Sequence, residues 1–261
     1  MGSYPTLFGV GSVMCALVCM SSCAKSENRL SQPEHLKWGY ETENGPAVWG
    51  KLSPEYILCS DGTHQSPIDI ANPIRANLPG ITINYQPATL TMRNNGHTIE
   101  VTYPKGSWLE VDGARFQLLQ FHFHAPSEHT VTGKSLDMEM HLVHTSDDGT
   151  LAVVGAFIRR GRENAAFNPI WAHLPTAPGQ AKSVEGVTFN ADELLPSARH
   201  TYRYEGSLTT PPCSEGVKWF VLKSPIEMSE AQITAFKAII DNNNRPVQPL
   251  DGRELLEEVS D

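Results

Sequence analysis

The sequence FQLLQFHFH occupies residues 116–124, and MEMHLVH occupies residues 138–144. Both stretches alternate with a period of two, which is typical of a β-strand whose two faces differ. The first strand then directs one set of side chains to a core face: Leu119, Phe121 and Phe123. Its opposite face carries Gln120, His122 and His124. In the second strand, one face carries Glu139, His141 and Val143.

This pattern predicts a metal site. Imidazoles two residues apart on one strand face lie roughly 6–7 Å apart at Cα, so His122 and His124 can share one ion. If the two strands are neighbours, His141 completes a set of three nitrogens. Three neutral imidazoles suit Zn²⁺ and leave a fourth position for water, so we expect one zinc ion per chain. Gln120 and Glu139 are candidates to fix the ligand rings.

The other histidines do not share this setting. His144 is out of register with His141 and is not expected to be a ligand. Four more are expected to be structural or exposed: His35, His64, His173 and His200. Because the chain holds ten histidines, two of them at a spacing of two can also arise by chance, and the alternative is that no metal binds.

The body of the chain indicates a mixed α/β domain dominated by strands. Short apolar runs separated by turn signals predict strands over 81–85, 89–92, 98–103, 108–111, 116–123, 137–144, 151–158 and 218–222. Residues 229–242 have the cap and the apolar periodicity of a helix, and 164–173 are consistent with a short one. No linker or repeat interrupts 36–261, which we interpret as one domain. The net charge of −9 argues against a nucleic-acid partner, which requires a basic face.

The first residues are typical of an export signal. Residues 7–20 form an uncharged apolar run that is too short to span a membrane. We interpret 1–23 as a signal peptide and 24–35 as a tether. Small residues before Cys23 are similar to the lipobox of bacterial lipoproteins, so the mature protein is either lipid-anchored at Cys23 or released after ordinary cleavage. Both alternatives predict a periplasmic or cell-surface protein.

Only two cysteines, Cys59 and Cys213, lie outside the leader. In an exported domain two cysteines favour one disulfide, and two free buried thiols are the alternative.

From Trp38 to Leu250 the chain resembles the alpha-class carbonic anhydrases. The stretches that carry the resemblance are 38–40 (WGY), 65–70 (QSPIDI), 95–97 (NGH), 120–124 (QFHFH), 127–130 (SEHT), 139–144 (EMHLVH), 206–212 (GSLTTPP) and 245–250 (RPVQPL). Each is weak alone, but all of them in order are highly specific. The cysteine pair also matches bacterial members, which supports the disulfide.

The resemblance implies a large, twisted, mostly antiparallel sheet of about ten strands with short peripheral helices. It also implies a function, the reversible hydration of carbon dioxide to bicarbonate and a proton, in which a zinc-bound hydroxide attacks the substrate. As is known for this class of enzyme, the zinc ion lowers the pKa of its bound water into the neutral range. Secondary activity on small esters is an expected accompaniment.

The resemblance also assigns roles to individual residues. Thr209 would orient the hydroxide and pass its own proton to Glu128. The substrate pocket would consist of Val143, Val153, Leu208, Thr209, Thr210 and Trp219. His97 would carry protons to buffer, along a water path lined by Tyr40, Asn94 and Glu100. Glu100 departs from the family, which usually has an amide there, and its effect on the path stays open.

Two other functions are weighed against this one. The same site could serve a zinc hydrolase that cleaves esters, which needs a wider cleft. A metal-free binding protein of this fold would lack a ligand, whereas this chain retains all three histidines, Thr209 and Glu128. Expected partners are carbon dioxide, bicarbonate, sulfonamides and inhibitory anions, and the chain is expected to be a monomer or a homodimer.

Overall fold

The computed structural model describes residues 37–259. The predicted signal peptide 1–23, its Cys23 and the tether 24–35 lie outside the described residues. Within residues 37–259, no helix is long and apolar enough to cross a membrane.

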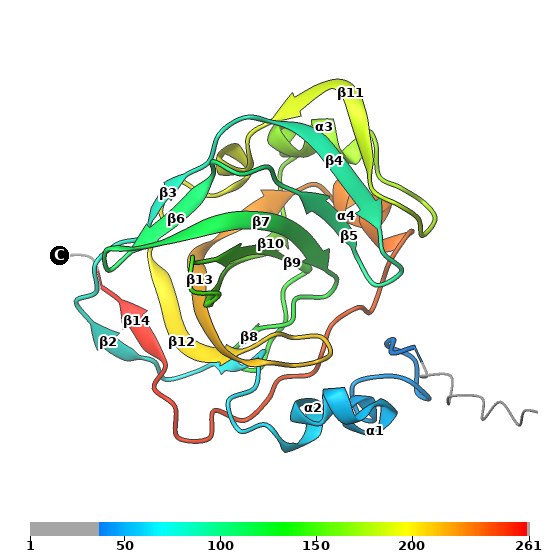
Figure 1. Cartoon of the computed structure of the whole chain (residues 1–261). Coiled ribbons are helices and arrows are strands. Elements are labelled where there is room, and N and C mark those ends of the chain that lie inside the picture. Colours follow the sequence, from blue (N-terminus) through cyan, green and yellow to red (C-terminus); the bar gives the residue numbers. More distant parts are fainter. Residues whose placement is uncertain (1–36, 260–261) are drawn as a thin grey trace, which may run out of the picture. The chain divides into compact units, whose positions relative to one another are not determined.

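One twelve-stranded sheet organises the described chain (Figure 1). From one edge to the other its main path runs β11 (Lys182–Phe189), β4 (Ala88–Asn94), β5 (Ile99–Thr102), β7 (Ala114–His124), β9 (Met138–Thr145), β10 (Leu151–Arg160), β13 (Glu215–Met228), β12 (Thr201–Ser207), β14 (Leu256–Glu258) and β2 (Ile74–Ala76). Off this path, β3 (Thr82–Asn84) pairs with β6 (Trp108–Val111), which pairs with β7. A second, two-stranded sheet joins β1 (Asp69–Ile70) to β8 (Thr130–Val131).

Most strand pairs are antiparallel, and the exceptions in the large sheet are β10 with β13 and β14 with β2. This architecture confirms the expected fold class, with twelve strands where about ten were expected. All eight strands predicted from apolar runs and turn signals are present, although β13 extends well beyond the predicted 218–222. Four strands of the large sheet were not predicted: β2, β11, β12 and β14. β11 gave no signal because seven of its eight side chains are exposed or partly exposed.

The helices are short. They are α1 (Trp49–Leu52), η1 (Pro54–Tyr56), α2 (Leu58–Asp61), η2 (Ala165–Phe167), α3 (Asn168–Trp171), η3 (Ala191–Leu194) and α4 (Glu230–Lys237). The helix predicted at 229–242 is α4, which begins with a capping box between Ser229 and Gln232 and ends earlier than predicted. The short helix expected at 164–173 is divided between η2 and α3.

A β-bulge in β7 corrects one sequence-based expectation. Leu118 pairs with His144 and Gln120 pairs with Val143, so Leu119 is an extra residue between the two pairs. Leu118 is therefore fully buried, whereas Leu119 is 39% exposed and does not belong to the core as expected. After the bulge the expected alternation holds, because Phe121 and Phe123 are buried while His122 lies on the other face.

The two faces of the central strands contribute to different hydrophobic clusters. Val154 of β10 belongs to the larger one, together with Phe121, Phe123 and Leu142. Its neighbour Val153 belongs to a smaller cluster on the opposite face. The histidine-bearing face of the sheet thus has an apolar cluster of its own.

Candidate metal centre

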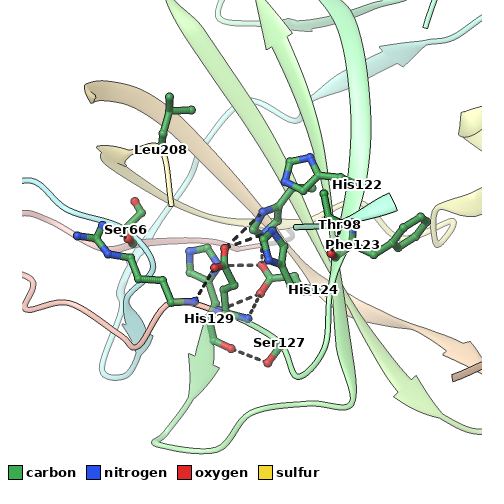
Figure 2. A network of polar contacts seen from close by, with 12 residues as sticks. Ser66, Thr98, His122, Phe123, His124, Ser127, His129 and Leu208 are labelled. Carbon is green, nitrogen blue, oxygen red and sulfur yellow. Dashed lines mark hydrogen bonds and ion pairs between the residues drawn. The ribbon is translucent and has the colours of Figure 1, made fainter. Parts of the chain in front are cut away.

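The three predicted ligands lie together at the middle of the sheet. His122 and His141 are directly opposite each other on β7 and β9. The ring centroids of His124 and His141 are 4.6 Å apart, and those of His122 and His124 are 5.1 Å apart. One nitrogen from each ring lies within 4.8 Å of the others. Figure 2 shows both β7 histidines on one side of the strand and Phe123 on the other.

A polar partner close to one nitrogen fixes the orientation of each ring. His122 donates its Nδ1 proton to Oε1 of Gln120 at 2.8 Å. His124 donates its Nδ1 proton to the Asn243 carbonyl at 2.7 Å. Nε2 of His141 lies 3.0 Å from Oε1 of Glu139. This pattern leaves Nε2 of His122, Nε2 of His124 and Nδ1 of His141 as the nitrogens available to a metal.

The chemistry of this donor set fits zinc. Among residues 37–259, the buried Nε2 of His124 has no hydrogen-bond partner. An unsatisfied buried polar atom is costly, and a metal ion at the centre of the three rings would satisfy it. Three neutral nitrogens with one position left over are the donor set of a catalytic zinc site.

The electrostatics keep the three rings neutral at physiological pH. Burial, with repulsion from the other two rings, holds the pKa of His122 well below its usual range. Burial lowers the pKa of His124 to about 4 and also lowers the pKa of His141. A neutral imidazole is the form that coordinates a metal, so the chain presents these ligands ready to bind.

Behind His141 lies a buried polar network, of which the sequence predicted only Glu139. Oε1 of Glu139 lies 2.7 Å from Nδ1 of His129, and Nε2 of His129 lies 2.7 Å from the Tyr204 hydroxyl. Tyr204 in turn donates to Oγ of Ser66 at 2.8 Å. Burial raises the pKa of Glu139, but His129 and His141 outweigh it and hold that pKa well below its usual range. Glu139 is therefore an anion beside the proposed ligand.

His129, Glu139 and His141 also form a group with metal-ligating atoms. Their atoms bond to one another, at 2.7 Å and 3.0 Å, so no donor remains for a second ion. The sequence did give one signal for His129: it lies in the stretch 127–130, which is part of the family resemblance. The resemblance assigned no role to this residue.

Thr209 and Glu128 lie next to each other. Both are buried, and the Thr209 side chain hydrogen-bonds to the Glu128 carboxylate. Oε1 of Glu128 also accepts the backbone N–H of Arg245 at 2.8 Å. Burial raises the pKa of Glu128 to about 7, and these hydrogen bonds oppose the rise. Oε2 of the same carboxylate is 3.5 Å from Nε2 of His124.

An apolar wall adjoins the histidines. Val143, Val153 and Trp219 are consecutive cross-strand neighbours on β9, β10 and β13, and Leu208 packs against the same cluster. The Trp219 ring is 4.9 Å from the His141 ring, centroid to centroid. The four predicted apolar pocket residues therefore form one surface.

The loop from Leu208 to Ser214 carries Thr209 and Thr210 and is covalently tied to α2. Thr210 accepts the backbone N–H of Cys213 at 2.9 Å. Cys213 is bonded to Cys59, which confirms the predicted disulfide and excludes the two free thiols.

The structure brings together only some of the residues that were predicted to form the proton path. His97 stacks on Trp38 with ring centroids 3.6 Å apart, and Tyr40 lies 6.5 Å from His97. These rings and Asn95 line one cavity of about 760 Å³. Asn94 does not line it, because its side chain is buried and bonds Gly96 and Pro175 instead.

Glu100 also stands apart from this cavity. It lies on β5 opposite His122, and both of its carboxylate oxygens bond the guanidinium of Arg93. Burial lowers the pKa of His97, and Glu100 is not among the causes of that shift.

The family model for eukaryotic-type carbonic anhydrases matches residues 44–259. A carbonic anhydrase of Nostoc sp. is 43% identical over 244 residues, which cover 92% of this chain and 91% of that protein. A carbonic anhydrase of Klebsiella pneumoniae is 46% identical over 84% of this chain and 90% of its own length. The alpha-carbonic anhydrase of Thermovibrio ammonificans, solved with sulfanilamide, superposes with a TM-score of 0.81 at 47% identity, covering 84% of this chain and 98% of that one.

Proposed function

This chain is an enzyme of the eukaryotic-type (alpha) carbonic anhydrase family, and we propose that it hydrates carbon dioxide reversibly at a zinc ion held by His122, His124 and His141. The observation that carries the proposal is the cluster of three neutral imidazoles, of which His124 and His141 are buried and His122 is partly buried, with Nε2 of His124 lacking a hydrogen-bond partner. The contacts of the three rings with the oxygens of Gln120, Asn243 and Glu139 support the assignment of the coordinating nitrogens.

Zinc bound there supplies a Lewis acid that makes water nucleophilic near neutral pH. The chain's part is to orient that water. Because the Thr209 side chain hydrogen-bonds to Glu128, its hydroxyl proton is committed and its oxygen is left as an acceptor. A water in the cleft can then donate a hydrogen bond to Thr209 and present its lone pair to the substrate.

The apolar wall provides a place for the substrate. Carbon dioxide is small and uncharged, so it gains from contact with Val143, Val153, Leu208 and Trp219. We place Thr210 at the edge of this pocket. A small ester can reach the same wall, and secondary esterase activity is part of the proposal.

A proton leaves the site at each turnover, and we assign its transfer to His97. The imidazole is half-buried, lies against Trp38 and lines an open cavity, so it has access to buffer. Burial lowers its pKa below the ordinary value, which favours rapid release of the proton. The expected path residue Tyr40 lines the same cavity as His97, and Asn95 takes the place of Asn94 and Glu100 beside this route.

The sulfanilamide complex of the Thermovibrio enzyme supports the proposal that aromatic sulfonamides inhibit this chain. The disulfide supports export to an oxidising compartment, with residues 1–23 as the signal. Periplasmic or cell-surface residence, lipidation at Cys23 and a monomeric or homodimeric state are parts of the proposal that rest on the sequence.

The test is the effect of His141→Ala on both zinc and rate. We expect the variant to lose its zinc, measured by elemental analysis, and its carbon dioxide hydration, measured by stopped flow. His173→Ala is the matched control, because His173 is exposed and bonds only the Pro169 carbonyl among the described residues. Full zinc occupancy and full rate in His141→Ala would show that the ligand set is wrong.

A further inference from the structure

Glu100 lies one strand away from the proposed metal. Arg93, Glu100, His122 and His141 are successive cross-strand neighbours on β4, β5, β7 and β9. Residues directly opposite in a sheet share a face, so Arg93 and Glu100 stand on the same face as the ligands. The burial of Ile99 and Val101, on either side of Glu100, agrees with this orientation.

The two side chains form a bidentate ion pair. Nε of Arg93 donates to Oε1 of Glu100 at 3.0 Å, and Nη2 donates to Oε2 at 3.2 Å. The carboxylate is the more enclosed partner, with 16% of its side chain exposed against 42% for Arg93. The negative end of the pair is thus nearer to His122 and better shielded from water than the positive end.

Resting on the proposed function, we propose that this pair determines the anion affinity of the site: Glu100 repels anions that compete for the fourth metal position, and Arg93 moderates that repulsion. The charge of Glu100 does not repel neutral carbon dioxide, whereas it repels bicarbonate and inhibitory anions. The pair therefore discriminates by charge between the substrate and the product of the hydration reaction.

Coulomb's law gives the size of the effect. Two unit charges about 10 Å apart, at an effective dielectric constant of about 20 to 80, change an anion's affinity by roughly two- to sixteenfold. Arg93 lies one strand further away and is more exposed, so its own effect is the smaller of the two.

The test uses the full chain loaded with Co²⁺, and thiocyanate as the probe anion. Its dissociation constant is read from the visible spectrum of the bound cobalt at low salt. We expect Glu100→Gln to tighten thiocyanate binding roughly three- to tenfold, because the positive charge of Arg93 is left alone. We expect Arg93→Gln to weaken binding about twofold, because the carboxylate is no longer balanced.

Three further variants separate charge from structure. The double variant Arg93→Gln/Glu100→Gln is neutral at both positions, so its dissociation constant is expected between those of the two single variants. Arg93→Lys keeps the charge and is expected to retain wild-type affinity. Glu110→Gln is the matched control, because Glu110 and Arg115 form a cross-strand pair at the far end of β7.

A role in folding alone would move both single variants in the same direction, whereas an electrostatic role moves them in opposite directions. The differences are also expected to shrink at about 0.5 M salt, where charges are screened over a few ångströms. Shifts of the same sign, or shifts no larger than that of Glu110→Gln, would overturn the inference while leaving the proposed function intact. A wild-type chain that binds no Co²⁺ would overturn both.

Discussion

His144 shows how one residue of register separates a structural histidine from a ligand. It lies three residues after His141 but on the opposite face of β9. There it is fully buried, on the side of the sheet that holds the larger hydrophobic cluster. Nδ1 donates to the Ala152 carbonyl at 3.2 Å, and Nε2 accepts the Tyr85 hydroxyl at 2.7 Å. Acceptance from Tyr85 requires the neutral ring, and burial lowers the pKa of His144 to about 4.

This depressed pKa predicts a pH-dependent contribution to stability. Between about pH 6.5, the unfolded value, and about pH 4, the unfolded chain binds the proton and the folded chain does not. The contribution is therefore complete above pH 6.5 and is lost as the pH falls, at up to about 1.4 kcal/mol per pH unit. The free energy of unfolding, measured with urea at several pH values across this range, should change less steeply with pH in His144→Gln than in the wild type. Equal slopes for both proteins would contradict the assignment.

For His97 we expect a defect that depends on buffer. His97→Ala removes the proposed proton carrier but touches neither the ligands nor the apolar wall. Hydration should slow several-fold in dilute buffer and recover when imidazole is added, since small imidazoles can replace the lost group. Stopped flow over a buffer series measures this. A rate that is independent of buffer in both proteins would remove His97 from the mechanism.

At the scale of residues, the sequence predicted which side chains share a strand face, because alternation determines this. The faces of Gln120, His122, His124 and His141 followed from period two alone. Asn243, by contrast, contacts His124 across 119 residues of chain, and no local pattern reports such a contact. His129 and Tyr204 were missed for the same reason.

At the scale of elements, the loop from Leu208 to Ser214 is positioned by a segment far from it in sequence. Nε2 of Gln65 donates to the Cys213 carbonyl and to Glu215, and its Oε1 accepts from Arg245. Arg245 supplies the backbone N–H that holds Glu128. The two stretches 65–70 and 245–250 thus connect the loop that contains Thr209 to the segment that contains Glu128.

We therefore predict that Gln65→Leu impairs turnover without removing the metal. The substitution leaves buried partners unsatisfied, which costs about 1–3 kcal/mol of stability. It also frees the loop that carries Thr209, so kcat should fall while zinc content stays at the wild-type level. Gln248→Leu is the control, since within 37–259 its side-chain amide bonds only the exposed Pro246 carbonyl. A fall in zinc content parallel to kcat would place Gln65 in metal retention instead.

Strand prediction succeeded for strands with buried apolar runs, such as β7, β9 and β10, and failed for the largely exposed edge strands β11 and β2. It also missed β12, although five of the seven residues of that strand are buried. The bulge at Leu119 could not be foreseen, because an extra residue in one strand is defined only by its partner strand.

At the scale of the described domain, the disulfide joins distant parts of one chain. Cys59 and Cys213 are separated by 154 residues, and the bond connects α2 to the loop that carries Thr209. The apolar runs indicated a domain dominated by strands, but a single large sheet was predictable only from the resemblance, because composition and strand periodicity do not fix the order of twelve strands.

Closing so long a loop restricts the unfolded chain. The loop-entropy model gives about 4–5 kcal/mol for this length, so Cys59→Ser/Cys213→Ser should be less stable by several kcal/mol at most. Denaturant unfolding of both proteins, with and without reductant, measures the difference. Reductant should not change the free energy of unfolding of the variant. If it also left that of the wild type unchanged, a structural role for the bond would be contradicted.

X-ray absorption at the zinc edge of the purified chain tests the metal centre most directly. We predict one zinc ion per chain, bound by three imidazole nitrogens at about 2.0–2.1 Å with one further oxygen ligand. The nitrogen signal should be lost with the metal in His124→Ala. A sulfur ligand, a carboxylate in place of an imidazole, or a chain that holds no zinc would contradict the proposed centre.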